Sequence, residues 1–80
     1  MRLDKYLKVS RVIKRRTVAN EACDAGRVTV NGKTARASYD IKENDIVEIA
    51  FGTRKMKFKV CAVNEFAKKD DASLMYEVIG

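Results

Sequence analysis

The sequence has no histidine and only two cysteines in 80 residues, and these shortages exclude most catalytic chemistry. Without histidine, no ordinary general base titrates near neutral pH. Cys23 falls in a predicted helix without a histidine partner, which argues against a nucleophilic thiol. The carboxylates are too scattered for acid–base pairs or a metal site, and the isolated glycines form no phosphate-binding loop of a recognised kind. We therefore expect a binding protein rather than an enzyme, with no cofactor and no metal.

Long apolar segments and cysteine motifs are also missing. No apolar run approaches the ~20 residues that span a bilayer, and the first residues lack the apolar core of a signal peptide. Cys23 and Cys61 match no metal-binding or redox spacing, so we expect two buried or half-buried, reduced thiols. The prediction is a cytoplasmic protein with no membrane partner.

The length allows one domain with a thin core. A chain of this size buries only about 60% of the surface that its unfolded form exposes. Its 46% hydrophobic and 35% charged residues fit a folded globule rather than a disordered chain. We expect a single domain over residues 1–80 that acts as a monomer.

The first quarter of the chain predicts a short amphipathic helix. Leu3, Tyr6 and Leu7 recur at helical spacing, which indicates a helix over about residues 2–9. Asp4 lies in its first turn, where a carboxylate suits the helix dipole. We expect Asp4 to cap the helix or to orient a nearby arginine rather than to touch a ligand.

A second helix is predicted from an N-cap at Thr17 to about Ala25. Gly26 is a natural residue to end it, because glycine tolerates a positive φ. Small side chains run along this helix, so we expect the two helices to pack closely. The small residues are Ala19, Ala22, Cys23 and Ala25.

After Gly26 the apolar period changes from helical to alternating, as in strands. Asn31-Gly32 is a strong type I′ hairpin signal between strands at residues 28–30 and 33–35. Residues 67–73 are expected to form a solvated loop. Further strands are predicted over residues 46–51, 55–60 and 75–79. The fold class is therefore α+β, with two short N-terminal helices packed on a small, mostly antiparallel sheet.

The positive charge is confined to one half of the chain. Residues 1–36 hold ten basic and three acidic residues, a net charge of +7, whereas residues 37–80 hold seven and eight, a net charge of −1. Solubility requires no such segregation, and a concentrated positive field suits a polyanion. Nucleic acid is the favoured partner over a membrane surface.

The densest cations lie in the connection between the two predicted helices. They lead to the N-terminus of the second helix, where exposed amides and the helix dipole favour a phosphate. Arginine predominates, and its planar group suits bidentate phosphate contacts and stacking on bases. The candidate RNA-binding residues are Arg2, Lys5, Lys8, Arg11, Lys14, Arg15, Arg16, Thr17, Arg27, Lys33 and Arg36.

A second basic feature is the stripe of Lys55, Lys57 and Lys59 on one predicted strand. Edge strands often carry lysine against aggregation, so this stripe need not contact RNA. Tyr6 and Phe58 occupy core-like positions and are not interpreted as base-stacking residues. The sheet also lacks the aromatic signature of an RRM.

Three blocks of the first half follow one another in a fairly specific order and spacing. The blocks are Arg2-Leu3-Asp4-Lys5-Tyr6-Leu7, Arg15-Arg16-Thr17 and Gly26-Arg27-Val28-Thr29-Val30-Asn31-Gly32. Together they resemble the αL RNA-binding domain of small-subunit ribosomal protein S-four, which is also attached to pseudouridine synthases and tyrosyl-tRNA synthetases. This resemblance implies an αL motif over about residues 1–50, followed by further strands over residues 51–80.

The resemblance extends to one branch of that family. It is carried by residues 1–17, Phe51-Gly52, the strand to Val60 and residues 72–79. These segments are similar to the RqcP family of stand-alone members, which is akin to heat-shock protein fifteen. Heat-shock protein fifteen has a basic C-terminal extension that this sequence lacks, which favours the RqcP branch.

The RqcP resemblance implies a ribosome-associated quality control factor. Such proteins bind large ribosomal subunits obstructed by peptidyl-tRNA, contacting large-subunit rRNA and the P-site tRNA, and support RqcH-dependent alanine tailing of the stalled chain. Whether an RqcH-like factor is contacted directly stays open. Arg2 and Arg16 match the motif arginines most strongly, Lys14 and Arg15 fit as neighbouring contacts, and Asp4 is a motif residue without an assigned role.

Three other hypotheses stay open from the sequence. The chain could be the recognition module of an RNA-modifying enzyme, or another rRNA-binding protein of the heat-shock-protein-fifteen type. It could also be a helix-turn-helix DNA binder, because two short helices precede the sheet. The last is disfavoured, since the second helix would offer mostly alanines to a DNA groove.

Overall fold

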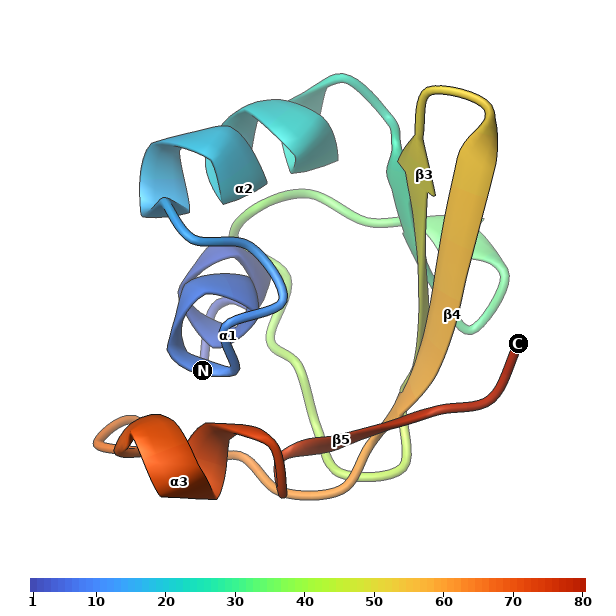
Figure 1. Cartoon of the computed structure of the whole chain (residues 1–80). Coiled ribbons are helices and arrows are strands. Elements are labelled where there is room, and N and C mark those ends of the chain that lie inside the picture. Colours follow the sequence, from blue (N-terminus) through green and yellow to red (C-terminus); the bar gives the residue numbers. More distant parts are fainter.

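The computed structural model describes all residues, 1–80, and shows two layers. Helices α1 (Leu3–Val9) and α2 (Arg16–Asp24) lie on one side of a five-stranded sheet (Figure 1). None of the helices has the length and apolar character needed to cross a membrane. The α+β prediction, with two short N-terminal helices on a small sheet, is confirmed.

The sheet has the strand order β2-β1-β3-β4-β5, and every neighbouring pair is antiparallel. The strands are β1 (Val28–Val30), β2 (Lys33–Thr34), β3 (Ile46–Phe51), β4 (Arg54–Val60) and β5 (Tyr76–Val78). The predicted β1–β2 turn is confirmed, because Asn31 and Gly32 have φ values of 53° and 83°. Two positive φ values are what a type I′ turn requires.

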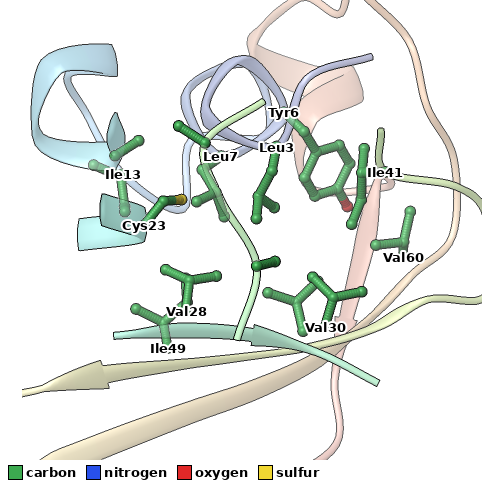
Figure 2. Close-up of a cluster of buried hydrophobic side chains, with 14 of the residues drawn as sticks. Leu3, Tyr6, Leu7, Ile13, Cys23, Val28, Val30, Ile41, Ile49 and Val60 are labelled. Carbon is green, nitrogen blue, oxygen red and sulfur yellow. The ribbon is translucent and has the colours of Figure 1, made fainter. Parts of the chain in front are cut away.

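The core lies between the sheet and α1, as Figure 2 shows. Burial alternates along the central strands, so Val28 and Val30 of β1 share the helix-facing side with Phe58 and Val60 of β4. Leu3, Tyr6 and Leu7 of α1 point toward these strands, and all three are fully buried. The predicted amphipathic face of the first helix is therefore the face that forms the core.

Three sequence-based expectations were wrong. The segment expected to be a solvated loop contains a short helix, α3 (Lys69–Ala72), in which Ala72 is 1% exposed. One buried alanine among charged residues leaves no periodic pattern to detect. Cys61 is exposed, because it follows the last residue of β4 and points away from the core. Thr17 does not cap α2, which begins at Arg16 with Arg15, two residues before Thr17, at the N-cap position.

Helix α2 ends as predicted, because Ala25 is its C-cap and Gly26 follows with a φ of 76°. Only some of its small residues take part in the close helix packing that the sequence predicts. Ala19 and Cys23 are buried against the core, whereas Ala25 is exposed. Burial raises the pKa of the Cys23 thiol to about 11, with nearby Asp4 and Asp24 adding to the effect. A thiol held neutral in this way is a packing group rather than a nucleophile.

Tyr6 joins the beginning of the chain to its end. Its hydroxyl donates a buried hydrogen bond of 2.8 Å to the Met75 carbonyl. Its ring stacks on Phe58 with centroids 6.4 Å apart, and Phe58 in turn meets Tyr76 edge-on at 5.3 Å. Such aromatic pairs add stability beyond the area that they bury. The C-terminal segment is thereby attached to α1 as well as to the sheet.

Replacing Tyr6 with Phe should lower the free energy of unfolding by about 1 kcal/mol, the ordinary net worth of one hydrogen bond. The ring packing is kept, and the Met75 carbonyl still accepts bonds from the amides of Cys61 and Ala62. Urea denaturation measures the change. Tyr76→Phe is the matched control and should be nearly neutral; an equal loss in both variants would contradict the role given to the buried hydroxyl.

Candidate nucleic-acid interface

The Asp4 carboxylate is the centre of a hydrogen-bonded cluster between α1 and α2. Its side chain is only 3% exposed. Oδ1 accepts a bond from the Lys5 amide at 2.8 Å, and Oδ2 accepts one from Asn20 Nδ2 at 3.2 Å. Arg2 Nε lies 3.2 Å from Oδ1, and Arg16 Nε lies 3.4 Å from Oδ2. One buried anion therefore holds two arginines that are 14 positions apart in the sequence.

Arg2 and Arg16 are fixed at one end and open to solvent at the other. Their side chains are 51% and 46% exposed, respectively. Arg16 contacts Asp4 only through Nε, so its terminal N–H groups have no protein acceptor. Fixing such long side chains in advance removes part of the entropy that a ligand contact would otherwise cost. The cluster presents two guanidinium groups suited to phosphate oxygens.

The pKa of Asp4 is lowered even though the carboxyl group is buried. Desolvation acts to raise the pKa, but hydrogen bonds from Asn20, Arg2, the Lys5 amide and Arg16 together outweigh it. All of these donors favour the charged form. Asp4 is thus an anion at neutral pH, and the expectation that it orients a nearby arginine is confirmed for both Arg2 and Arg16.

A second group of cations surrounds a hollow beside the C-terminal half of α1. Its basic lining residues are Lys8, Arg11 and Lys14, and Glu65 and Ala67 complete the rim. Lys5 Nζ lies 3.7 Å from the Glu65 carboxylate, so the acid at the rim is already partnered. Three cations around a concave surface concentrate positive potential there and favour an anionic ligand.

The backbone at Arg11 is held in an unusual conformation, with a φ of 62°. Its amide bonds to the Lys8 carbonyl, and the Ile13 amide reaches the Leu7 carbonyl, both at 3.0 Å. The turn allows Ile13 to be buried immediately after α1 ends. A left-handed conformation costs an L-residue about 1–2 kcal/mol. The link therefore combines a strained backbone with an exposed arginine beside the hollow.

The structure brings some of the other predicted site residues close to these two groups and leaves others apart. Arg15 and Thr17 are exposed at the start of α2, where no side chain caps the helix. Arg36 precedes a segment whose carbonyls accept bonds from the first amides of α1. Arg27 lines a different hollow, between α2 and β3, and Lys33 lies at the β2 edge. The last two are separate from the cation groups.

The lysine stripe of β4 is matched by acids on the neighbouring strands. Lys57 pairs in register with Glu48 of β3, and Lys59 pairs with Glu77 of β5. Lys55 Nζ also lies 3.6 Å from Glu48. Opposite charges on adjacent strands stabilise a sheet modestly and cancel much of each other's field. The stripe is therefore better explained as part of the sheet than as an RNA contact.

Two contributors to the site were missed by the sequence analysis. Asn20 donates to Asp4 from the second turn of α2, a position to which the sequence analysis gave no role. Glu65 and Ala67 reach the hollow from a segment that is more than 50 positions away from Lys8 and Arg11. The sequence gives a weak signal for the Asn20 contact, because the small side chains of α2 predict close packing on α1. It gives no signal that Glu65 and Ala67 reach the hollow.

Comparison with known proteins identifies relatives of this chain. Residues 1–47 match the S4 domain. The "RQC P-site tRNA stabilizing factor" of Streptococcus pneumoniae is 58% identical over 99% of this chain and 90% of its own length. The protein of the same name from Bacillus subtilis is 46% identical over 99% of the chain and 92% of its own length.

Solved structures resemble the whole chain. A trimeric structure of Vibrio cholerae heat shock protein 15 covers 99% of this chain and 81% of its own, with a TM-score of 0.90 and 22% identity. A solution structure of the hypothetical protein HP1423 covers 100% of the chain and 98% of its own, with a TM-score of 0.83 and 26% identity. The arrangement of helices and sheet is thus shared at low sequence identity.

Replacing Asp4 with Asn should lower the free energy of unfolding by about 1–3 kcal/mol at neutral pH, because charge-assisted bonds to both arginines are lost. A carboxyl group with a lowered folded-state pKa stabilises the fold above its unfolded pKa, and this contribution is lost as the pH falls through the folded value. The difference between parent and variant should therefore be constant above about pH 5 and shrink below about pH 4.

Urea denaturation at a series of pH values measures this difference. Asp24→Asn is the control, because Asp24 is exposed at the end of α2 and makes no side-chain hydrogen bond or ion pair. Its effect should be small at every pH. A pH-independent difference for Asp4→Asn would show that the charge on Asp4 is not what stabilises the cluster.

Arg11→Gly should stabilise the fold by about 0.5–1 kcal/mol. Relief of the left-handed strain contributes about 1–2 kcal/mol, and the added freedom of the unfolded chain removes part of it. Thermal and urea unfolding measure the result. Arg11→Ala removes the same charge but keeps a Cβ, so it should bring no gain. Equal stability of the two variants would contradict a strained backbone at this position.

Proposed function

The chain belongs to the S4 domain family and, within it, to the family of its relatives called RQC P-site tRNA stabilizing factors; from this premise we propose that it binds structured RNA on the large ribosomal subunit. The observation that carries the proposal is the pair of half-exposed arginines, Arg2 and Arg16, fixed by one buried carboxylate. Preformed guanidinium pairs suit the phosphate groups of a folded RNA.

The proposed binding mode is recognition of RNA shape through the backbone. Arg2 and Arg16 form one contact point, and Lys8, Arg11 and Lys14 around the hollow form a second. Two cationic groups on one folded domain select an RNA surface with phosphates at matching positions, without reading base sequence. Arg15, Thr17, Lys5 and Arg36 extend this surface, whereas Arg27 and Lys33 contribute at most at its margin.

A helix-turn-helix mode of DNA binding is less well supported by the geometry. Ala19 and Cys23 of α2 are buried against the core, so they are not available to a groove. The exposed side of the same helix includes Glu21 and Asp24, which would repel a phosphate backbone. Helix α2 therefore serves to hold Arg16 and Asn20 near Asp4 rather than to enter a major groove.

The wider role proposed here is that of a non-catalytic quality control factor. In this role the chain binds large subunits that are obstructed by peptidyl-tRNA and contacts both large-subunit rRNA and the P-site tRNA. It acts in the cytoplasm as a monomer and supports RqcH-dependent alanine tailing of the stalled nascent chain. The name shared by relatives that are 46% and 58% identical supports this role, as does the charge of +7 on residues 1–36.

Arg16→Ala should weaken binding to large ribosomal subunits by about 1–3 kcal/mol, the usual cost of losing a charge-assisted contact. Co-sedimentation at fixed salt measures the binding, and large subunits carrying peptidyl-tRNA are compared with vacant ones. The parent protein should prefer the subunits that carry peptidyl-tRNA. Affinity should also fall steeply with added salt, because each phosphate contact releases counterions.

Lys55→Ala is the matched control, since it also removes one exposed cation but from the sheet, where Lys55 faces Glu48. It should leave co-sedimentation nearly unchanged. Equal losses for Arg16→Ala and Lys55→Ala would mean that net charge alone governs binding. No preference for subunits carrying peptidyl-tRNA would contradict the proposed role while leaving RNA binding itself intact.

A further inference from the structure

The loop between β4 and α3 borders the cation-lined hollow. Glu65 and Ala67 of this loop line the hollow together with Lys8 and Arg11. The ion pair between Lys5 and Glu65, at 3.7 Å, connects the loop to α1. The hollow is thus built from segments at both ends of the chain, and whatever binds the cations also lies beside this loop.

Phe66 lies between Glu65 and Ala67 in the chain, and its side chain is almost wholly exposed to solvent. It is 86% exposed, and its amide donates a 3.0 Å hydrogen bond to Asn64 Oδ1, which fixes the local turn. A single exposed apolar side chain is common on protein surfaces and needs no explanation by itself. Phe66 does not itself line the hollow, but both of its neighbours in the chain do. An exposed aromatic residue directly beside a hollow lined by three cations is a more specific arrangement.

Cationic grooves with an aromatic ring beside them are the usual means of binding unpaired nucleotides. The cations follow the phosphates while a base stacks on the ring, and stacking tolerates any base. We propose that Phe66 stacks on an unpaired base of the bound RNA while Lys8, Arg11 and Lys14 hold the adjacent phosphates. This inference rests on the proposed RNA-binding function, and it names the ligand at the hollow as a nucleotide outside a duplex.

The charges around the hollow favour RNA over a protein partner there. Lys8, Arg11 and Lys14 face the single acid Glu65, which already pairs with Lys5. A protein docking on Phe66 would have to cover these cations with its own acids, whereas a nucleotide supplies the ring partner and the negative charge together. Tyr6 and Phe58 are fully buried in the core, and Phe66 is the exposed aromatic residue whose chain neighbours line this hollow.

The probes for the test are a stem–loop RNA with an unpaired loop and a blunt RNA duplex carrying the same number of phosphates. Phe66→Ala should weaken binding to the stem–loop by about tenfold, which corresponds to the loss of one stacked base. Binding to the duplex should be unchanged, because the cations remain. Leu74→Ala is the control: Leu74 is 72% exposed in the C-terminal part of the chain, but neither of its chain neighbours lines the hollow, so its loss should affect neither probe.

A second variant reports on stacking directly. The chain contains no tryptophan, so Phe66→Trp introduces the sole tryptophan fluorophore at the rim. Its fluorescence should be quenched by the stem–loop and not by the duplex, and its affinity should match or exceed that of the parent. Because Phe66 is outside the core, neither substitution should change the midpoint of thermal unfolding.

The outcomes separate this inference from the proposed function. If Arg16→Ala weakens stem–loop binding but Phe66→Ala does not, RNA binding stands and stacking by Phe66 is refuted. Equal weakening of both probes by Phe66→Ala, or an unquenched Phe66→Trp variant, also refutes it. If the parent binds neither these probes nor large subunits, both the proposed function and this inference fail.

Discussion

The arrangement of the basic surface depends on the buried carboxylate of Asp4. A charge removed from water is costly unless it is fully partnered, and Asp4 obtains its partners from α1, from α2 and from the residue before α1. The requirement works in both directions. Asp4 needs donors to remain charged inside the fold, and the arginines gain a fixed position by supplying them. The same contacts therefore pack the two helices together and position the arginines of the binding surface.

The thin core is supported by contacts between distant parts of the chain. Tyr6 bonds to the Met75 carbonyl, and its ring stack continues through Phe58 to Tyr76. The same C-terminal segment supplies the rim of the basic hollow through Glu65 and Ala67. A small domain has few buried residues to hold its surface in place, so contacts that order the core also order the binding surface.

The sequence predicted the parts of the molecule that follow a local rule. The face of α1, the Asn31-Gly32 turn and the alternation along β4 are all periodic or turn signals, and they were confirmed. The predicted start of α2 was wrong. The preference of Thr17 for the N-cap position is weak, and the helix begins at Arg16, so that Thr17 lies in its first turn. The helix α3, the Asn20 contact and the loop side of the hollow depend on tertiary packing, which a single sequence does not encode locally.

The matched charges on the outer side of the sheet have a consequence for how the protein approaches a polyanion. Glu48 and Glu77 offset most of the charge of the three lysines there, while residues 1–36, which include both helices of the binding surface, carry a net charge of +7. The excess positive charge is therefore unevenly distributed over the molecule, with most of it in the part of the chain that carries the two N-terminal helices. In the field of a nucleic acid such a body rotates before contact, so a larger fraction of collisions presents the arginine-bearing side first.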